Sequence, residues 1–111
     1  MRFWDIVPAA VSRATRTDLF AGRNAFGIFA ALGLEQIAME YIVVDTLRVD
    51  RNTFATILTA WRDGYAGIIA ENTALSVDDA VAYFDQMIAD VRDPGRYAVW
   101  MVPVLSGRVP A

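Results

Sequence analysis

The sequence predicts an α+β fold in which two or three antiparallel strands combine with about four helices. Two observations carry this prediction. Segments 36–47 and 96–106 hold the β-branched and aromatic runs typical of strands, whereas segments 50–71 and 77–92 repeat apolar residues at helical spacing. The elements follow the order helix, strand, helix, helix, strand. We therefore expect two strands that lie far apart in the sequence to pair antiparallel.

Residues 1–35 are predicted to form an N-terminal helical segment. Residues 9–16 have helical character, and Pro8 either interrupts the apolar run before them or opens a first helical turn. Residues 23–32 are predicted to be a short helix that ends at Gly33, because glycine suits a left-handed C-cap. The helical spacing in this segment is carried by Phe26, Phe29 and Ala30.

Residues 36–47 are predicted to be a strand in which apolar side chains occupy both odd and even positions. The run from Tyr41 through Ile42 and Val43 to Val44 is apolar throughout, which is typical of a strand buried on both faces. We therefore expect the centre of this strand to be covered on both sides.

Residues 50–92 are predicted to form a helical pair. Asp50 is a candidate N-cap of the first helix, because its carboxylate can accept a hydrogen bond from a free backbone N–H of the first turn. Ser76, with Asp79 three residues later, resembles a capping box at the start of the second helix. Each helix carries one continuous apolar stripe and therefore needs a packing partner.

Residues 96–106 are predicted to be the last strand. Pro103 lies within it and cannot donate to a strand ladder, so we place it at a sheet edge or in a bulge. We predict that residues 1–111 form a single domain or a fragment of a larger domain.

The composition excludes several kinds of catalysis. The chain has no His and no Cys, and all ten of its basic residues are Arg. Ser-His-Asp and Cys-His triads, lysine Schiff bases, and thiolate or imidazole metal sites therefore cannot be built from this chain. We predict no catalytic residue and no metal ligand.

Net charge and hydropathy limit the classes of partner that the chain can bind. A net charge of −3 argues against a nucleic-acid partner, which would require a basic face. No apolar stretch reaches the roughly 18–20 residues of a membrane helix, and no signal peptide is evident at the N-terminus, so we expect a cytoplasmic protein without a membrane partner. Apolar residues nevertheless make up 56%, and the mean hydropathy is +0.34. This excess predicts either a large core or an apolar surface meant for a partner.

The charged residues leave two interpretations open. Arg23, Arg48 and Arg51 could grip an anionic ligand, or they could be surface charges and ion-pair members. Glu40 could face a cleft, although an outward-facing strand position fits it as well. Four acidic residues lie opposite the apolar stripe of one helix, which favours a solvated face over a metal site; they are Asp78, Asp79, Asp85 and Asp90.

Several short stretches, taken in order, resemble the C-terminal third of the class I S-adenosylmethionine-dependent methyltransferases. The resemblance points to the branch related to ubiquinone and menaquinone biosynthesis or to small-molecule methylation, and it spans roughly residues 1–109. It implies that the two strands are the last two of a Rossmann-like sheet. The matching stretches are Met1-Arg2-Phe3-Trp4, Ala21-Gly22-Arg23, residues 30–34, residues 38–41 and residues 97–108.

The chain departs from this family where the family binds its cofactor. The glycine-rich loop after the first strand and the acidic residue that ends the second strand have no counterpart here. We therefore predict no cofactor-binding residue, no cofactor bound by this chain alone, and S-adenosylmethionine binding only if the missing half is supplied. The resemblance also implies that the 50–92 helices and the first twenty residues cover the substrate. The candidate substrate-facing residues are Trp4, Trp61, Tyr65 and Phe84.

Two alternatives remain open beside the methyltransferase-like interpretation. One is a non-enzymatic interaction module that forms a homodimer, either through the edges of strands 36–47 or 96–106 or through the 50–71 helix. The other is a small-ligand pocket lined by Trp61, Tyr65 and Phe84, which would take a small-molecule substrate.

Overall fold

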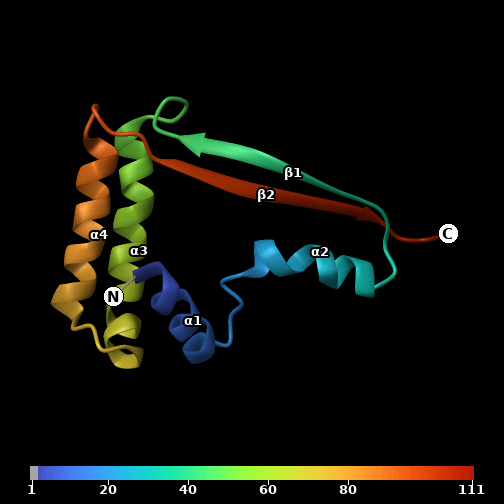
Figure 1. Cartoon of the computed structure of the whole chain (residues 1–111), viewed down its shortest axis with the longest axis horizontal. Coiled ribbons are helices and arrows are strands. Elements are labelled where there is room, and N and C mark those ends of the chain that lie inside the picture. Colours follow the sequence, from blue (N-terminus) through green and yellow to red (C-terminus); the bar gives the residue numbers. More distant parts are fainter. Residues whose placement is uncertain (1–2) are drawn as a thin grey trace.

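The computed structural model of the chain describes residues 3–111, which form four helices and a two-stranded antiparallel sheet (Figure 1). The predicted α+β class and the element order are confirmed. The opening Met1-Arg2 of the family resemblance lies outside the described residues. The elements are α1 (Phe3–Thr15), α2 (Ala21–Ala31), β1 (Glu35–Asp45), α3 (Arg51–Asn72), α4 (Val77–Arg92) and β2 (Val99–Arg108).

Helices α3 and α4 form an antiparallel hairpin, and α1 packs across it (Figure 1). Both predicted caps are present. The Asp50 carboxylate accepts a hydrogen bond from the Thr53 N–H at 3.1 Å, and Ser76 forms a reciprocal capping box with Asp79. These bonds satisfy backbone N–H groups that the first turn of a helix leaves free. The helices therefore begin where local sequence chemistry places them.

Helix α1 differs from its predicted form. It already runs from Phe3, so Pro8 lies inside the helix and neither interrupts it nor opens it. A proline inside a helix removes one backbone hydrogen bond. That cost is offset because Phe3, Val7 and Val11, at positions i, i+4 and i+8, are all buried in the core shared with α3 and α4.

The two strands form a long ribbon that extends away from the α3–α4 hairpin (Figure 1). Ile42 pairs with Val102 and Tyr41 pairs with Pro103, and an irregularity lies between Glu35 and Ala38. Pro103 is tolerated because each strand of a two-stranded sheet has a free edge, as predicted. β2 begins at Val99, three residues after the predicted start at position 96, because Arg96 is bonded to Arg51 of α3 and Tyr97 to Asp45 at the end of β1.

The centre of β1 is not covered on both faces, so that prediction is wrong. Tyr41 and Ile42 point to opposite faces, and each is 55% exposed. The reason is that the sheet has only two strands and that α2 is the one helix lying along it in the described part of the chain. Tyr41 and Ile42 therefore stay exposed, whereas Val44, at the end of the run, packs against the core of α3 and α4.

Helix α2 lies against one face of the ribbon. A Cβ atom at Gly22 would come within 2.8 Å of the Pro103 ring, so glycine allows the close approach of helix and strand. Gly33 follows the helix with φ of +76°, and its N–H donates to the Ala30 carbonyl. The predicted left-handed C-cap is thus confirmed. No residue of α2 is buried, however, so the helix covers the ribbon incompletely.

The resulting shape is open. The radius of gyration is 16.8 Å, against about 13 Å for a compact domain of this length. No helix within residues 3–111 combines the length and apolar character needed to cross a bilayer.

Candidate functional site: an aromatic pocket

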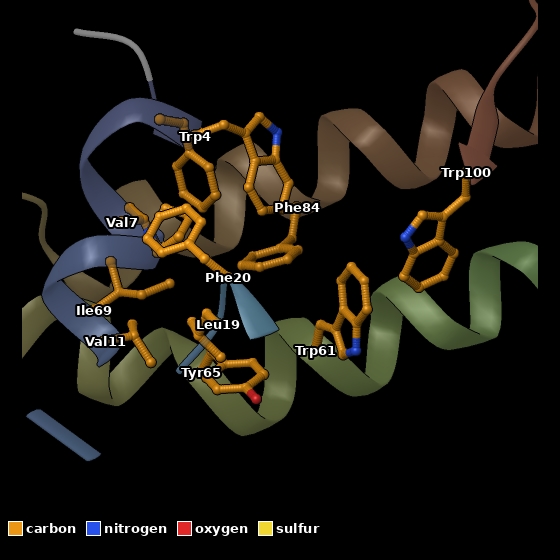
Figure 2. Close-up of a pocket in the computed structure, with 12 residues that line it drawn as sticks. Trp4, Val7, Val11, Leu19, Phe20, Trp61, Tyr65, Ile69, Phe84 and Trp100 are labelled. Carbon is orange, nitrogen blue, oxygen red and sulfur yellow. The ribbon is translucent and has the colours of Figure 1, made fainter. Parts of the chain in front are cut away.

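A pocket of about 430 Å³ lies where α1, the α1–α2 linker, α3, α4 and the start of β2 meet (Figure 2). Its size falls within the roughly 300–1,000 Å³ typical of ligand pockets. Aromatic and aliphatic side chains form its walls. They are Phe3, Trp4, Val7, Pro8, Val11, Leu19, Phe20, Trp61, Tyr65, Ile69, Phe84 and Trp100.

All four candidate substrate-facing residues line this pocket. Phe84, on α4, is 3% exposed and forms the most deeply buried of the four walls. Trp61 and Tyr65 are partly buried and lie one turn apart on α3. Trp4, on α1, is 52% exposed and lies at the rim. Residues from the N-terminal segment and from two predicted helices are thus brought together around one cavity.

The rings around the pocket pack edge to face. The Trp61 and Trp100 rings are 4.6 Å apart between centroids and inclined by 86°. Phe3 contacts Phe84 at 5.5 Å and Trp4 at 5.0 Å, both in T-shaped geometry. Such pairs are favoured because the positive edge of one ring meets the negative face of another. They hold the pocket walls in fixed orientations.

Sequence reasoning missed Leu19 and Phe20 as pocket residues. Leu19 and Phe20 belong to the α1–α2 linker, where no periodicity marks an inward face. Arg23 holds the linker in place, because its guanidinium lies 5.1 Å from the centre of the Phe20 ring. This contact gives Arg23 a structural role. The one available signal was aromatic content, since Phe20 is a large apolar residue outside any predicted helical stripe.

The pocket walls carry no charged side chain. None of the twelve lining residues is Asp, Glu or Arg, and Tyr65 is the one tyrosine among them. The nearest charged residue on α3, Arg62, is turned outward, where it bridges to Asp85 of α4 at 2.7 Å. Its hydrogen bonds to Asp85 and Asp63 raise the pKa of Arg62, so it stays charged. The pocket can bind and orient an apolar molecule, but it contains no acid–base pair.

A buried carboxylate, Asp45, connects the end of β1 with the turn that leads to α3 and with the segment between α4 and β2. Its side chain accepts hydrogen bonds from the Tyr97 hydroxyl at 2.8 Å and from the N–H groups of Leu47 and Arg48 at 3.0 and 2.8 Å. The Arg48 guanidinium also forms an ion pair with the Asp45 carboxylate. Burial by itself would raise the pKa of Asp45, but the hydrogen bonds and the Arg48 charge outweigh burial and lower it. Asp45 is therefore a structural tie and stays ionised.

The other two arginines considered for anion binding also have structural partners. Arg48 pairs with Asp45. Arg51, at the start of α3, donates to the carbonyls of Val91 and Asp93 at 2.8 Å and of Arg96 at 3.0 Å. These carbonyls belong to the end of α4 and the turn after it, so Arg51 fastens the two helix termini together.

The acidic residues are dispersed. Asp79 belongs to the capping box, Asp85 pairs with Arg62 and Asp90 pairs with Arg96. Glu40 is exposed on the ribbon. Within residues 3–111, no three side chains of the metal-ligating types lie close enough together to hold an ion.

Comparison of the chain with models of known protein families, with curated proteins and with solved structures finds no match.

Proposed function

We propose that this chain supplies the last two strands and the substrate-covering helices of a class I methyltransferase-like domain. In this proposal the chain alone does not transfer methyl groups, and S-adenosylmethionine binds only when the rest of the sheet is present. The aromatic pocket covers the methyl acceptor. The proposal places the protein in the cytoplasm.

The open ribbon is the observation that carries this proposal. The accessible surface of 7429 Å² exceeds by about 1,300 Å² the roughly 6,100 Å² expected of a compact monomer of 12.3 kDa. A standard protein interface takes about 800 Å² from each partner, so the excess is large enough for one. Both faces of the ribbon expose apolar side chains, as a strand does when its sheet neighbours and covering helices are missing.

The arrangement of the helices supports the same proposal. In the sequence, the α3–α4 hairpin lies between the two strands. Its Trp61, Tyr65 and Phe84 line a pocket beside the start of β2. Methyl transfer depends mainly on proximity and orientation, because the sulfonium of the cofactor supplies the leaving group. A pocket without an acid–base pair can serve this chemistry by holding an acceptor in place.

The test compares this chain with a longer product of the same gene. Genomic DNA upstream of the Met1 codon is sequenced, and any in-frame extension is expressed beside the 111-residue chain. We expect the extension to encode a strand followed by a glycine-rich loop. Calorimetric titration should then show micromolar S-adenosylmethionine binding by the longer product and none by the shorter. Micromolar binding by the shorter chain, or an upstream frame without such a strand and loop, would contradict the proposal.

A matched pair of substitutions tests whether S-adenosylmethionine binding by the longer product depends on the ribbon faces. Ile42 is 55% exposed on the ribbon, whereas Leu47 is 80% exposed in the turn after β1. Ile42→Lys should abolish S-adenosylmethionine binding by the longer product, because a charge would have to be buried where the ribbon joins the sheet. Leu47→Lys should leave that binding unchanged. Equal effects of the two substitutions would argue against a role for the ribbon faces.

A second candidate function is a homodimeric interaction module, which the same exposed ribbon favours. A second copy could pair along the free edge of β1 or β2 and cover Ile42 and Val102. The apolar stripe of α3 is the weaker candidate, because Phe54 and Leu58 are already buried within the chain. Sedimentation velocity at tens of micromolar should then show a dimer that Ile42→Lys dissociates. A strictly monomeric profile would count against this candidate.

A further inference from the structure

We propose that the aromatic pocket binds a neutral, flat molecule of two or three fused aromatic rings. Its role as the methyl acceptor rests on the proposed function. Binding itself does not, because every wall of the pocket belongs to the described part of this chain.

The absence of charge among the lining residues indicates a neutral ligand. A carboxylate or ammonium group that entered the pocket would lose its hydration and meet no opposite charge there. Both Arg62 and Asp85 are engaged with each other on the outer surface of the helical hairpin. The pocket therefore discriminates against ions of either sign.

The volume of the pocket indicates the number of rings. An apolar cavity of about 150 Å³ is enough to bind one benzene molecule. The pocket measures about 430 Å³, close to three times that volume. Two or three fused rings would fill it, whereas a single ring would leave most of the walls without contacts.

The orientation of the walls indicates a flat aromatic ligand. The Trp61 ring stands at 86° to the Trp100 ring, and the Phe3 ring stands at 89° to the Phe84 ring. A flat ring system can stack on one wall while its edge meets the face of a perpendicular wall. A saturated ring system of similar size has no π-face and lacks these contacts. Trp4, at the rim, would lose part of its exposed surface when the ligand enters.

The tryptophans provide a direct readout. The chain has three, and all of them line the pocket, so the three indole N–H signals in a ¹H–¹⁵N NMR spectrum report on it. The 111-residue chain is titrated at neutral pH with 2-naphthol, with the 2-naphthoate anion and with saturated decahydro-2-naphthol. We expect saturable shifts with 2-naphthol, and affinities weaker by about tenfold or more for the other two probes. Absence of saturable shifts with 2-naphthol, or equal affinity for all three probes, would overturn the proposal.

Two substitutions complete the experiment. Leu19 lines the pocket from the linker and is 40% exposed, so an arginine can be introduced there without opening the core. Leu19→Arg should weaken the binding of 2-naphthol and strengthen the binding of 2-naphthoate, each by about tenfold in affinity. Leu47→Arg, at a site outside the pocket, should change neither. If Leu19→Arg leaves both affinities unaltered, the ligand is not in this pocket.

The outcomes separate this inference from the proposed function. Binding of S-adenosylmethionine by the longer product, without 2-naphthol binding, would overturn the ligand class and leave the methyltransferase-like sheet intact. Binding of 2-naphthol by the 111-residue chain, with no S-adenosylmethionine binding by a longer product, would leave the pocket standing and remove its role in methyl transfer.

Discussion

The molecule has a helical region, made of α1, α3 and α4, and a ribbon region, made of α2, β1 and β2. The two regions differ in how much of their apolar surface is buried. Every buried hydrophobic residue found among residues 3–111 lies on α1, α3 or α4. In the ribbon region, Tyr41, Ile42 and Met101 are each 55% exposed. The helical region thus contains its own core, whereas the ribbon region presents apolar surface that its own elements do not cover.

This contrast explains why an apolar composition and an open shape occur together. An isolated two-stranded sheet is marginally stable in water, and α2 buries none of its residues against it. The 56% of apolar residues therefore does not produce one large core. It is divided between a compact helical core and a ribbon whose apolar side chains stay largely exposed.

The largest difference between the two regions should appear when a phenylalanine is removed from each. Phe84 is 3% exposed in the helical core, and Phe26, on α2, is 49% exposed. Phe84→Ala should lower the free energy of unfolding by about 3–5 kcal/mol, because it removes a buried ring and leaves a cavity. Phe26→Ala should cost less than about 1 kcal/mol. Urea unfolding followed by far-UV circular dichroism measures both, and similar losses would break the contrast.

An arginine pair gives the next largest expected difference. Arg51 donates to three carbonyls at the end of α4, whereas Arg23 makes one exposed contact over Phe20. Arg51→Ala should destabilise the fold by about 1.5–3 kcal/mol, the range for hydrogen bonds of charged groups. Arg23→Ala should cost about 0.5–1 kcal/mol.

Arg51→Lys serves as the control for the first of these substitutions. Lysine keeps the charge but lacks the planar fork that reaches several carbonyls, so its stability should lie between the wild type and Arg51→Ala. If Arg51→Ala and the wild type melt at the same temperature, the three hydrogen bonds of Arg51 contribute nothing to stability.

The junction between the two regions should make stability depend on acid. The pKa of Asp45 is lowered in the folded chain, so its stabilising contribution is complete above the unfolded value, about 4. That contribution is lost as the pH falls through the lower folded value. Thermal melting at a series of pH values should show this loss in the wild type and a smaller one in Asp45→Asn. Parallel pH profiles of the two proteins would mean that Asp45 is not the tie described above.

The smallest expected effect lies at the contact between α2 and the ribbon. A side chain at Gly22 would meet the Pro103 ring, so Gly22→Val should push α2 away from β2. Because little surface is buried there, the free energy of unfolding should change by less than about 0.5 kcal/mol. The NMR signals of α2 and β2 should shift while those of α4 do not. A large loss of stability would show that α2 is better anchored than its exposure indicates.

Sequence reasoning succeeded where structure is decided locally. The caps at Asp50 and Ser76, the stripes of α3 and α4 and the turn at Gly33 depend on residues a few positions apart, and all are present. The predicted strand ends differ from the observed ones by up to three residues, since strand pairing is set by distant contacts.

The failures concern burial and long-range contacts. The run 41–44 has the pattern of a doubly covered strand, but a pattern cannot tell whether its neighbours are present. One of the hydrogen bonds to Asp45 comes from Tyr97, 52 positions away, so the local sequence does not show that this carboxylate is buried. Trp61, Tyr65 and Phe84 lie on the apolar stripes of predicted helices, and Trp4 is a candidate because the family resemblance makes the first twenty residues substrate-facing. Leu19 and Phe20 lie on a linker without periodicity.

Amide hydrogen exchange of the 111-residue chain, followed by NMR at low micromolar concentration, tests the central contrast most directly. The paired amides of β1 and β2 around Ile42 and Val102 should exchange much faster than those of α3 and α4 around Leu58 and Ile88. Faster exchange in the ribbon is the result that a sheet without its neighbours predicts. Equal protection of the strands and the helical hairpin in the monomer would contradict the account, because the ribbon would then be stable without a partner.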